Sequence, residues 1–285
     1  MALPVLILDG NVQAINSANV AAGGKPTGES YAAVLRSLDP DVKCTILAAA
    51  DPGGGQLPAG VSLDQFAGAA ITGSALNFHR GGPAIDQQVE LAKAMFAAEV
   101  PVFGSCWGLQ LMAAALGGTV RANPKGRELF IARSIWRTGA GKAHPMFKGK
   151  PLAFDAPAVH SDEVSVVPDG GVVLAANQMS DIQALSIVRG RSHFWGVQYH
   201  PEFSLHDLAV IVRRYGQRLV DEGLFKTLEE LQLFASSASA LSRDDADMAD
   251  AFAMGVSETI MSPAIRLAEL RNWLRDVVIG GYRLN

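Results

Sequence analysis

The chain has 285 residues, of which 49% are hydrophobic and 18% charged, a composition typical of a globular α/β protein with a substantial core. A net charge of −4 argues against a nucleic-acid partner, and no apolar stretch is long enough to cross a bilayer, so no membrane partner is expected. Two cysteines and an N-terminus without a basic leader exclude a disulfide framework and predict a cytoplasmic protein.

Strands and helices alternate through the first 118 residues, as in a parallel sheet covered by helices. Apolar runs that predict buried strands lie at residues 5–8, 42–47, 69–72 and 101–103. Helical patterns lie at residues 30–38, 85–96 and 107–116. The Gly-, Ala- and Asn-rich segment before residue 28 is predicted to be a loop.

The pattern changes at residue 119. Short apolar runs predict a mostly β segment over residues 119–199, joined to the same core, and a helix follows at residues 205–221. The predicted fold class is therefore α/β, with an open, mostly parallel twisted sheet flanked by helices and an added β segment. We expect one domain over residues 1–221 and a C-terminal helical extension, residues 222–285, packed on it. A lid or a docking surface is the alternative for this extension.

Cys106 lies where an apolar strand meets a helix, and Gly104 and Gly108 flank it. A tight strand-to-helix turn of this kind presents a nucleophile, and it needs glycines because the chain segments approach closely. The adjacent helix N-terminus favours the thiolate, which is the reactive form. The alternative is a buried structural cysteine.

A cysteine nucleophile needs a base and a group that orients the base. His200 directly follows an apolar strand, and Glu202 lies two residues further on. Because strands of a parallel sheet end along one rim, Cys106 and His200 can meet there. The alternatives are an ordinary His-Pro-Glu loop, or a metal site of His200 and Glu202 with His160 and Asp162. The metal site is disfavoured because the four residues lack a recognisable ligand spacing.

Two further turns bear on function. Ser74 follows the strand at residues 69–72, and its backbone N–H can stabilise an oxyanion together with that of Trp107. An ordinary turn is the alternative. Gly24-Lys25 hints at a phosphate loop, but Pro26 stands where serine or threonine is needed, so no nucleotide site is expected.

The segments Gly-Ser-Cys-Trp-Gly-Leu-Gln at residues 104–110 and Gln-Tyr-His-Pro-Glu at 198–202 resemble the signatures of the class I (triad) glutamine amidotransferases. The closest resemblance is to GMP synthase-type amidotransferase domains, and it covers roughly residues 4–215. It implies a flavodoxin-like fold and hydrolysis of the glutamine side-chain amide through a thioester on Cys106. Ammonia would pass to a separate synthetase or acceptor, and no cofactor is implied.

The resemblance also assigns roles by position. His200 would protonate the departing ammonia and then activate water, and Glu202 would orient His200. The N–H groups of Ser74 and Trp107 would form the oxyanion hole. The positions expected to surround the bound substrate are Gly73, Gln110, His160, Ser161 and Asp162. Glu128 falls where the family has an Arg-Glu-Phe-Gly stretch.

The sequence departs from the family in places. Ser74 and Ala75 replace a Gly-Pro pair, and Ser161 replaces a glycine. The residues after 215 lack a serine/glycine-rich phosphate loop, so a complete GMP synthase is not expected. Three hypotheses follow: a glutaminase that supplies ammonia to a partner, a hydrolase or transferase of other γ-glutamyl compounds, and a non-catalytic relative. The intact Cys106, His200 and Glu202 argue against the third.

Overall fold

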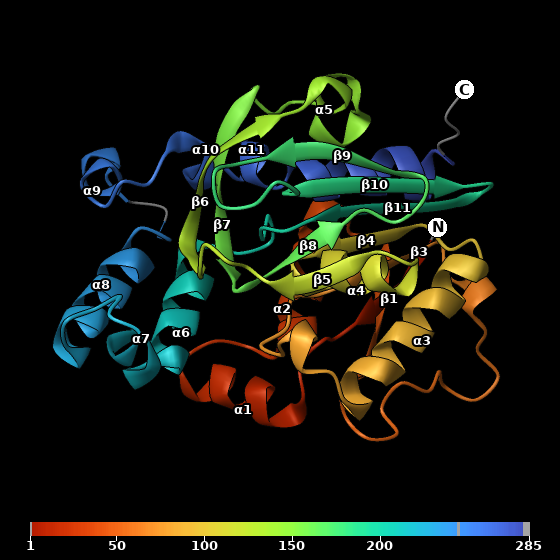
Figure 1. The fold of residues 1–285 in the computed structure, drawn as a ribbon, viewed down its shortest axis with the longest axis horizontal. Coiled ribbons are helices and arrows are strands. Elements are labelled where there is room, and N and C mark those ends of the chain that lie inside the picture. The colour runs from red at the N-terminus through yellow and green to blue at the C-terminus, as the bar shows by residue number, and fades with distance from the viewer. Residues whose placement is uncertain (1, 244–245, 282–285) are drawn as a thin grey trace.

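The computed structural model describes residues 2–243 and 246–281. Residues 244–245 and 282–285, which belong to the predicted extension, lie outside the described residues. The described strands form a large sheet of nine, in the order β2 (Val42–Leu47), β1 (Leu3–Leu8), β3 (Gly68–Ile71), β4 (Val102–Ser105), β11 (Ser192–Val197), β10 (Ala184–Arg189), β9 (Gly171–Ala176), β6 (Glu128–Arg137) and β7 (Ala153–His160). Helices lie on both sides of this sheet (Figure 1), which confirms the predicted α/β class.

The first five strands in this order are parallel. β1 shows why the sequences of these strands are continuous apolar runs. Val5 and Ile7 pack into the hydrophobic core on one face of the sheet, and Leu6 and Leu8 pack into the core on the other. A strand covered on both faces has no solvent-facing positions to alternate with.

The other four strands continue the sheet in antiparallel pairs. A second sheet of two strands pairs β5 (Thr119–Ala122) with β8 (Asp162–Val166). The prediction of an added β segment joined to the same core is confirmed. The short helix α5 (Gly139–Ala143) and the 3₁₀ turn η3 (Pro145–Phe147) interrupt this segment and were not predicted.

The remaining helices of the first 221 residues are α1 (Gln13–Ala21), α2 (Thr27–Leu38), α3 (Pro83–Ala97), α4 (Trp107–Ala115), α6 (Leu205–Tyr215) and α7 (Gln217–Asp221), with 3₁₀ turns η1 (Leu63–Gln65) and η2 (Phe78–Arg80). Among these helices, α2, α3 and α4 pack against the sheet, whereas α1 packs on α6, and α7 packs between α6 and α8 (Leu228–Ala240). α3 and α4 place Met95 and Met112 in the core that contains Leu6. α2 places Tyr31 and Leu35 in the opposite core.

The loop prediction for the segment before residue 28 is wrong, because residues 13–21 form α1. The buried residues of α1 are Asn16 and Asn19, which are polar. Asn16 Nδ2 donates to Asp9 at 2.9 Å, and Asn19 Nδ2 donates to the Thr27 hydroxyl at 3.2 Å. An inward face that is hydrogen-bonded rather than apolar leaves no hydrophobic period to detect.

The C-terminal block contains α8 (Leu228–Ala240), α9 (Met248–Ala253), α10 (Glu258–Met261), α11 (Pro263–Arg266), α12 (Ala268–Asn272) and the π-helical segment η4 (Trp273–Ile279). α8 packs with α6 at one end of the sheet, as Figure 1 shows, while Leu270, Trp273 and Leu274 complete the core beside Val5 and Ile7. The division into residues 1–221 and 222–285 stays a prediction. Every described helix is too short or too polar to span a membrane.

Candidate active site

Cys106 sits on a strained turn between β4 and α4. Its φ of 51° and ψ of −95° lie outside the regions that side-chain-bearing residues usually adopt. A Cβ on Gly104 would lie 2.6 Å from the carbonyl carbon of Gly108, and one on Gly108 would lie 2.6 Å from the carbonyl oxygen of Ile71. Strand and helix therefore approach as closely as the sequence predicted, and Cys106 is buried beside the N-terminus of α4.

Cys106 and His200 come from neighbouring parallel strands. β4 pairs with β11 so that Ser105 lies opposite Val197, and the N–H of Cys106 donates to the carbonyl of Val197 at 2.7 Å. His200 follows shortly after, and its N–H donates to the carbonyl of Pro157 on β7 at 2.8 Å. The two side chains reach the same edge of the sheet because the carboxyl ends of adjacent parallel strands meet there.

A carboxylate and an aromatic ring hold His200 in place. Its Nδ1 lies 2.8 Å from Oε1 of Glu202, and its ring stacks on Phe203 with the centroids 4.0 Å apart. Burial lowers the pKa of His200, but the charges of Glu202 and Cys106 and the hydrogen bond to Glu202 outweigh it and raise the pKa to about 10. Because Nδ1 is bonded to Glu202, Nε2 is the nitrogen that is available to Cys106. Nε2 makes no hydrogen bond among the described residues.

Glu202 is itself supported by two hydroxyl groups that the sequence did not single out. Its Oε2 accepts a hydrogen bond from the hydroxyl of Ser105 at 2.8 Å, and the Tyr31 hydroxyl lies 3.1 Å from that of Ser105. Burial and the charge of Glu202 raise the pKa of Tyr31 well above its usual value, so the phenol stays protonated. Tyr31 produced no signal because an inward-facing tyrosine on a helix looks like an ordinary core residue. Ser105 lies within the motif at residues 104–110, but its role could not be predicted because its partner, Glu202, is distant in the sequence.

Side chains hold the turn after β3 in shape. The hydroxyl of Ser74 donates to the carbonyl of Gly10 at 2.7 Å and accepts the N–H of Leu76 at 3.0 Å. Oδ1 of Asn11 accepts the N–H of Ala75 at 2.8 Å. Ser74 has no positive φ, so a serine fits where the family has glycine.

The two predicted oxyanion donors have N–H groups that are not engaged within the described part of the chain. The N–H of Ser74 makes no hydrogen bond there. Trp107 is the first residue of α4, and the first N–H groups of a helix have no partner inside it. Their assignment to an oxyanion hole stays a prediction.

Gly73 packs against the imidazole, and a Cβ at this position would lie 2.4 Å from Cε1 of His200. Gly73→Ala is expected to displace the ring and to lower kcat by roughly 100-fold, the usual consequence of a 1 Å misplacement. Steady-state kinetics with glutamine or another γ-glutamyl compound, the substrates that the resemblance implies, measure this. Gly139→Ala is the matched control, because its Cβ would meet no atom within 4 Å. Equal kinetics for the two variants would contradict the close packing of Gly73 on His200.

Gln110 and Gln198 form a chain of hydrogen bonds from the carbonyl of Asp162 to Sγ of Cys106. Nε2 of Gln110 donates to the carbonyl of Asp162 at 2.9 Å and to Oε1 of Gln198 at 3.2 Å. Nε2 of Gln198 lies 3.5 Å from Sγ of Cys106, and that sulfur lies 3.7 Å from the carbonyl of Val159. Gln198 was missed although it belongs to the second motif, because its position relative to the sulfur depends on the pairing of β11 with β4.

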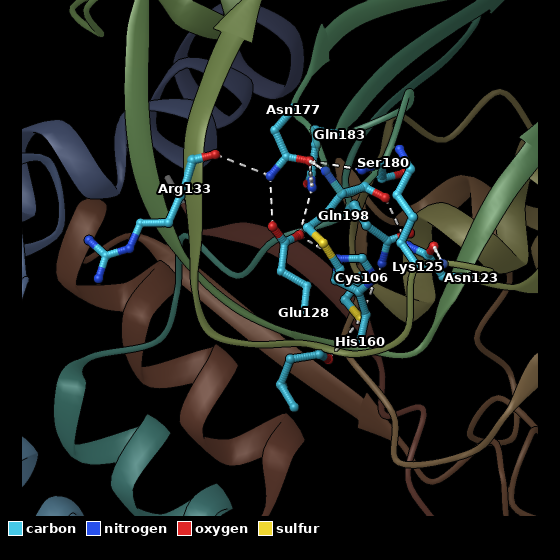
Figure 2. A network of polar contacts seen from close by, with 12 residues as sticks. Cys106, Asn123, Lys125, Glu128, Arg133, His160, Asn177, Ser180, Gln183 and Gln198 are labelled. Atoms are coloured by element: carbon cyan, nitrogen blue, oxygen red, sulfur yellow. Dashed lines mark hydrogen bonds and ion pairs between the residues drawn. The ribbon is translucent and has the colours of Figure 1, made fainter. Parts of the chain in front are cut away.

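His160 is fixed by a buried polar network, which Figure 2 shows. Its Nε2 lies 2.8 Å from Oε2 of Glu128, and its Nδ1 lies 3.0 Å from the carbonyl of Asp162. Asn177 and Gln183 donate to the two carboxylate oxygens of Glu128 at 2.6 and 2.7 Å. Both ring nitrogens of His160 are thus engaged within the protein, so the side chain positions the 160–162 loop. Direct contact of His160 with a substrate stays a prediction.

The same loop forms one wall of a pocket at the sulfur. Cys106, Gln110, Ser161 and Asp162 line this cavity, which we call the sulfur-side cavity. The carboxylate of Asp162 lies 2.9 Å from Nδ1 of His79, a partly exposed residue on η2. No role was predicted for His79, because a histidine in a loop carries no pattern.

The structure separates the residues of the alternative metal site. His200 pairs with Glu202, His160 pairs with Glu128, and Asp162 pairs with His79. Among residues 2–243 and 246–281, no group of three or more His, Cys, Asp or Glu side chains is arranged to hold a metal ion.

Comparisons with known proteins identify the family of this chain. The family model for class-I glutamine amidotransferases matches residues 65–213. A γ-glutamyl-L-1-hydroxyisopropylamide hydrolase from a Pseudomonas species is 35% identical over 283 residues, covering 97% of this chain and 94% of the relative. A glutamine-hydrolysing GMP synthase subunit from Methanoculleus marisnigri is 35% identical over 124 residues, covering 44% of this chain and 63% of the relative.

Solved structures show the same fold. A glutamine amidotransferase from Thermotoga maritima superposes with a TM-score of 0.67 at 16% identity, over 98% of this chain and 99% of that one. The family match includes Cys106, His200 and Glu202, and the hydrolase relative extends the similarity over nearly the whole chain. The chain therefore belongs to the class-I glutamine amidotransferase family, and it is an enzyme that acts on carbon–nitrogen amide bonds.

Proposed function

We propose that this enzyme hydrolyses γ-glutamyl amides to glutamate and an amine, with Cys106, His200 and Glu202 as its catalytic residues. The extent of the similarity carries this choice of substrate class. The match to the Pseudomonas hydrolase covers 97% of the chain and so reaches into the C-terminal block, whereas the match to the Methanoculleus GMP synthase subunit covers 44%. The buried pairing of His200 with Glu202 and Cys106 supports nucleophilic chemistry on an amide.

In the first half of the reaction, Sγ of Cys106 attacks the side-chain amide carbon and a sulfur–carbon bond forms. The carbonyl electrons move to oxygen, where the N–H groups of Ser74 and Trp107 stabilise the negative charge. When the carbonyl re-forms, the carbon–nitrogen bond breaks and Nε2 of His200 gives its proton to the leaving nitrogen. The products are the γ-glutamyl thioester and a neutral amine.

In the second half, water attacks the thioester carbon and Nε2 of His200 takes one of its protons. The carbon–sulfur bond then breaks, which restores the thiolate and the imidazolium, and the new carboxyl group ionises to give glutamate. Glu202 fixes the tautomer of His200 throughout, and the hydroxyls of Ser105 and Tyr31 hold Glu202. We assign Gly73, Gln110, His160, Ser161 and Asp162 to the walls around the glutamyl group.

The pKa of His200 sets an expected pH dependence. Imidazolium is the proton donor, and its pKa is about 10, so kcat/KM should fall as the pH rises through about 10. Glu202→Gln removes a charge that raises this pKa, and the fall should move to lower pH by roughly one to three units. Glu29→Gln, on the exposed side of α2, should leave the profile in place. A Glu202→Gln profile identical to the unmodified one would contradict the role of Glu202.

The raised pKa of His200 also affects folding. Its contribution to stability is complete below the ordinary histidine pKa of 6.5 and is lost as the pH rises through about 10. Thermal unfolding should therefore show a loss of stability between these two limits, and the loss should be smaller in Glu202→Gln.

The proposed function is tested by the release of glutamate from a panel of substrates that contains glutamine and several N-alkyl γ-glutamyl amides. We expect kcat/KM to be higher for the N-alkyl amides than for glutamine. Hydrolysis of glutamine alone would contradict the proposed substrate class while leaving the thioester chemistry intact.

A second candidate function is hydrolysis of glutamine to supply ammonia to a separate synthetase in the cytoplasm. The similarity to the Methanoculleus GMP synthase subunit favours it. Stimulation of glutamine hydrolysis by a co-purified synthetase would support this candidate. The division into a catalytic domain, residues 1–221, and an extension, residues 222–285, is part of either proposal.

A further inference from the structure

A second cavity lies on the His200 side of the site, and we call it the amine-side cavity. It spans about 560 Å³ and the sulfur-side cavity about 300 Å³, both counted with the open solvent at the mouth. The two cavities share Ser74, Ala75, Val159 and Tyr215 in their walls. They therefore adjoin, with Cys106 lining one and His200 lining the other.

The direction of proton transfer decides what each cavity can hold. The carbon under attack must lie at Sγ of Cys106, and the leaving nitrogen must lie within hydrogen-bond reach of His200. The glutamyl group then occupies the sulfur-side cavity, and any substituent on the nitrogen points past the imidazole into the amine-side cavity. Ammonia, the leaving group of glutamine, would leave this space without an occupant.

The walls of the amine-side cavity combine an apolar patch with polar and charged side chains. Val159, Phe203, Val210 and Ile211 supply apolar surface. Asn19 also lines the cavity and is 8% exposed, and its Oδ1 is buried with no hydrogen-bond partner among the described residues. A buried acceptor without a donor is costly, and a ligand hydroxyl or N–H group would satisfy it.

The charged groups of this cavity disfavour a cationic substituent and favour a hydrogen-bond acceptor. The guanidinium of Arg214 lies 5.0 Å from the centroid of the Tyr215 ring, and among the described residues its charge interacts with Tyr215 and with no carboxylate. Lys25 lines the cavity at its exposed side. Asp207 is occupied as the N3 residue of the α6 capping box, where it accepts from Ser204. A second ammonium group on the amine would meet Arg214, Lys25 and the imidazolium of His200.

We propose that the amine-side cavity is the binding site for the N-substituent of a γ-glutamyl amide, and that it selects a small branched alkyl group carrying a hydroxyl. This inference rests on the proposed function. The apolar wall contacts the alkyl group, Asn19 accepts the hydroxyl hydrogen, and Arg214 donates to the hydroxyl oxygen. A carboxylate satisfies Arg214 but leaves Asn19 without a donor, and an ω-ammonium group is repelled.

The first test narrows the cavity. Ser30 lines it from α2, and its side chain makes no hydrogen bond among the described residues. Ser30→Leu should lower the kcat/KM for γ-glutamyl isopropylamide relative to that for glutamine by at least about 10-fold, because the larger side chain would clash with the isopropyl group. A 10-fold change corresponds to about 1.4 kcal/mol of transition-state binding. Ser37→Leu makes the same change on the exposed side of the same helix and should leave the ratio unchanged.

The second test removes the acceptor, together with the Nδ2 donor to Thr27, and keeps the branched shape of the side chain. The unmodified enzyme should prefer a hydroxyalkyl amide over the plain alkyl amide by about 3- to 10-fold, and Asn19→Leu should abolish that preference. The unmodified enzyme should also hydrolyse an ω-aminoalkyl amide more slowly than either, and circular dichroism checks that each variant is folded.

The outcomes separate the two proposals. If the unmodified enzyme hydrolyses N-alkyl amides but Ser30→Leu and Asn19→Leu leave all ratios unchanged, the assignment of the cavity is overturned and the proposed function stands. If the enzyme hydrolyses glutamine alone, both are overturned. A preference for the carboxylate-bearing amide over the hydroxyalkyl amide would overturn the assigned chemistry of the substituent.

Discussion

Cys106→Ala is expected to lower kcat for γ-glutamyl amide hydrolysis by at least about 10⁴-fold, because the variant cannot form the thioester. Water attacking directly would still have the oxyanion donors and the bound geometry, which accounts for a small residual rate. The fold should be retained, since alanine adopts the strained backbone of Cys106 at a similar cost, and the hydrogen bonds of the deleted sulfur, to Gln198 and Val159 at 3.5 and 3.7 Å, are weak ones.

The matched control for this prediction is Cys44→Ala. Cys44 is the chain's other cysteine, and it lies half-buried on β2. Its replacement should leave kcat unchanged. Turnover by a folded Cys106→Ala variant within 10-fold of the unmodified enzyme would show that another group attacks the amide.

Glu269→Gln is expected to lower the free energy of unfolding by about 3 to 5 kcal/mol, as does the removal of one partner from other buried ion pairs. Lys150 and Glu269 form an ion pair with both side chains almost fully buried. The Tyr199 hydroxyl also donates to Glu269, and the Lys150 ammonium lies 4.4 Å from the centroid of the Phe154 ring. Burial lowers the pKa of Lys150, and the negative charge of Glu269 opposes this effect. In the variant, the Lys150 ammonium either stays buried without a counter-charge or loses its proton.

Urea unfolding of two further variants provides the comparison. Glu90→Gln breaks an exposed pair with Lys93 and should cost less than about 1 kcal/mol. The double variant Lys150→Met/Glu269→Leu replaces the pair with apolar groups and should recover most of the lost stability. A Glu269→Gln variant as stable as Glu90→Gln would contradict the view that this buried pair contributes to the stability of the fold.

The sequence predicted the parallel strands and the Cys106 turn because the physics there is local. A strand buried on both faces must be apolar throughout, as residues 5–8 are, and a tight turn at Cys106 needs Gly104 and Gly108. The meeting of Cys106 with His200 followed from one rule about where parallel strands end.

Interactions that depend on distant polar pairs were not predictable. α1 was missed because Asn16 and Asn19 face inward, and Tyr31 was missed because its partner lies on another element. Lys150 and Glu269 resemble surface charges in the sequence, and only the packing of α12 on the sheet buries them. Each of these features arises from a polar contact across the fold, which leaves no periodic trace in either segment.

The most direct test of the central claim is to quench the enzyme with acid during turnover of a γ-glutamyl amide and to locate the acyl group by mass spectrometry. We predict one γ-glutamyl group on the peptide that contains Cys106, and none in Cys106→Ala. A γ-glutamyl group on a different residue, or steady turnover with no acylated peptide in a quench fast enough to capture it, would contradict the thioester mechanism.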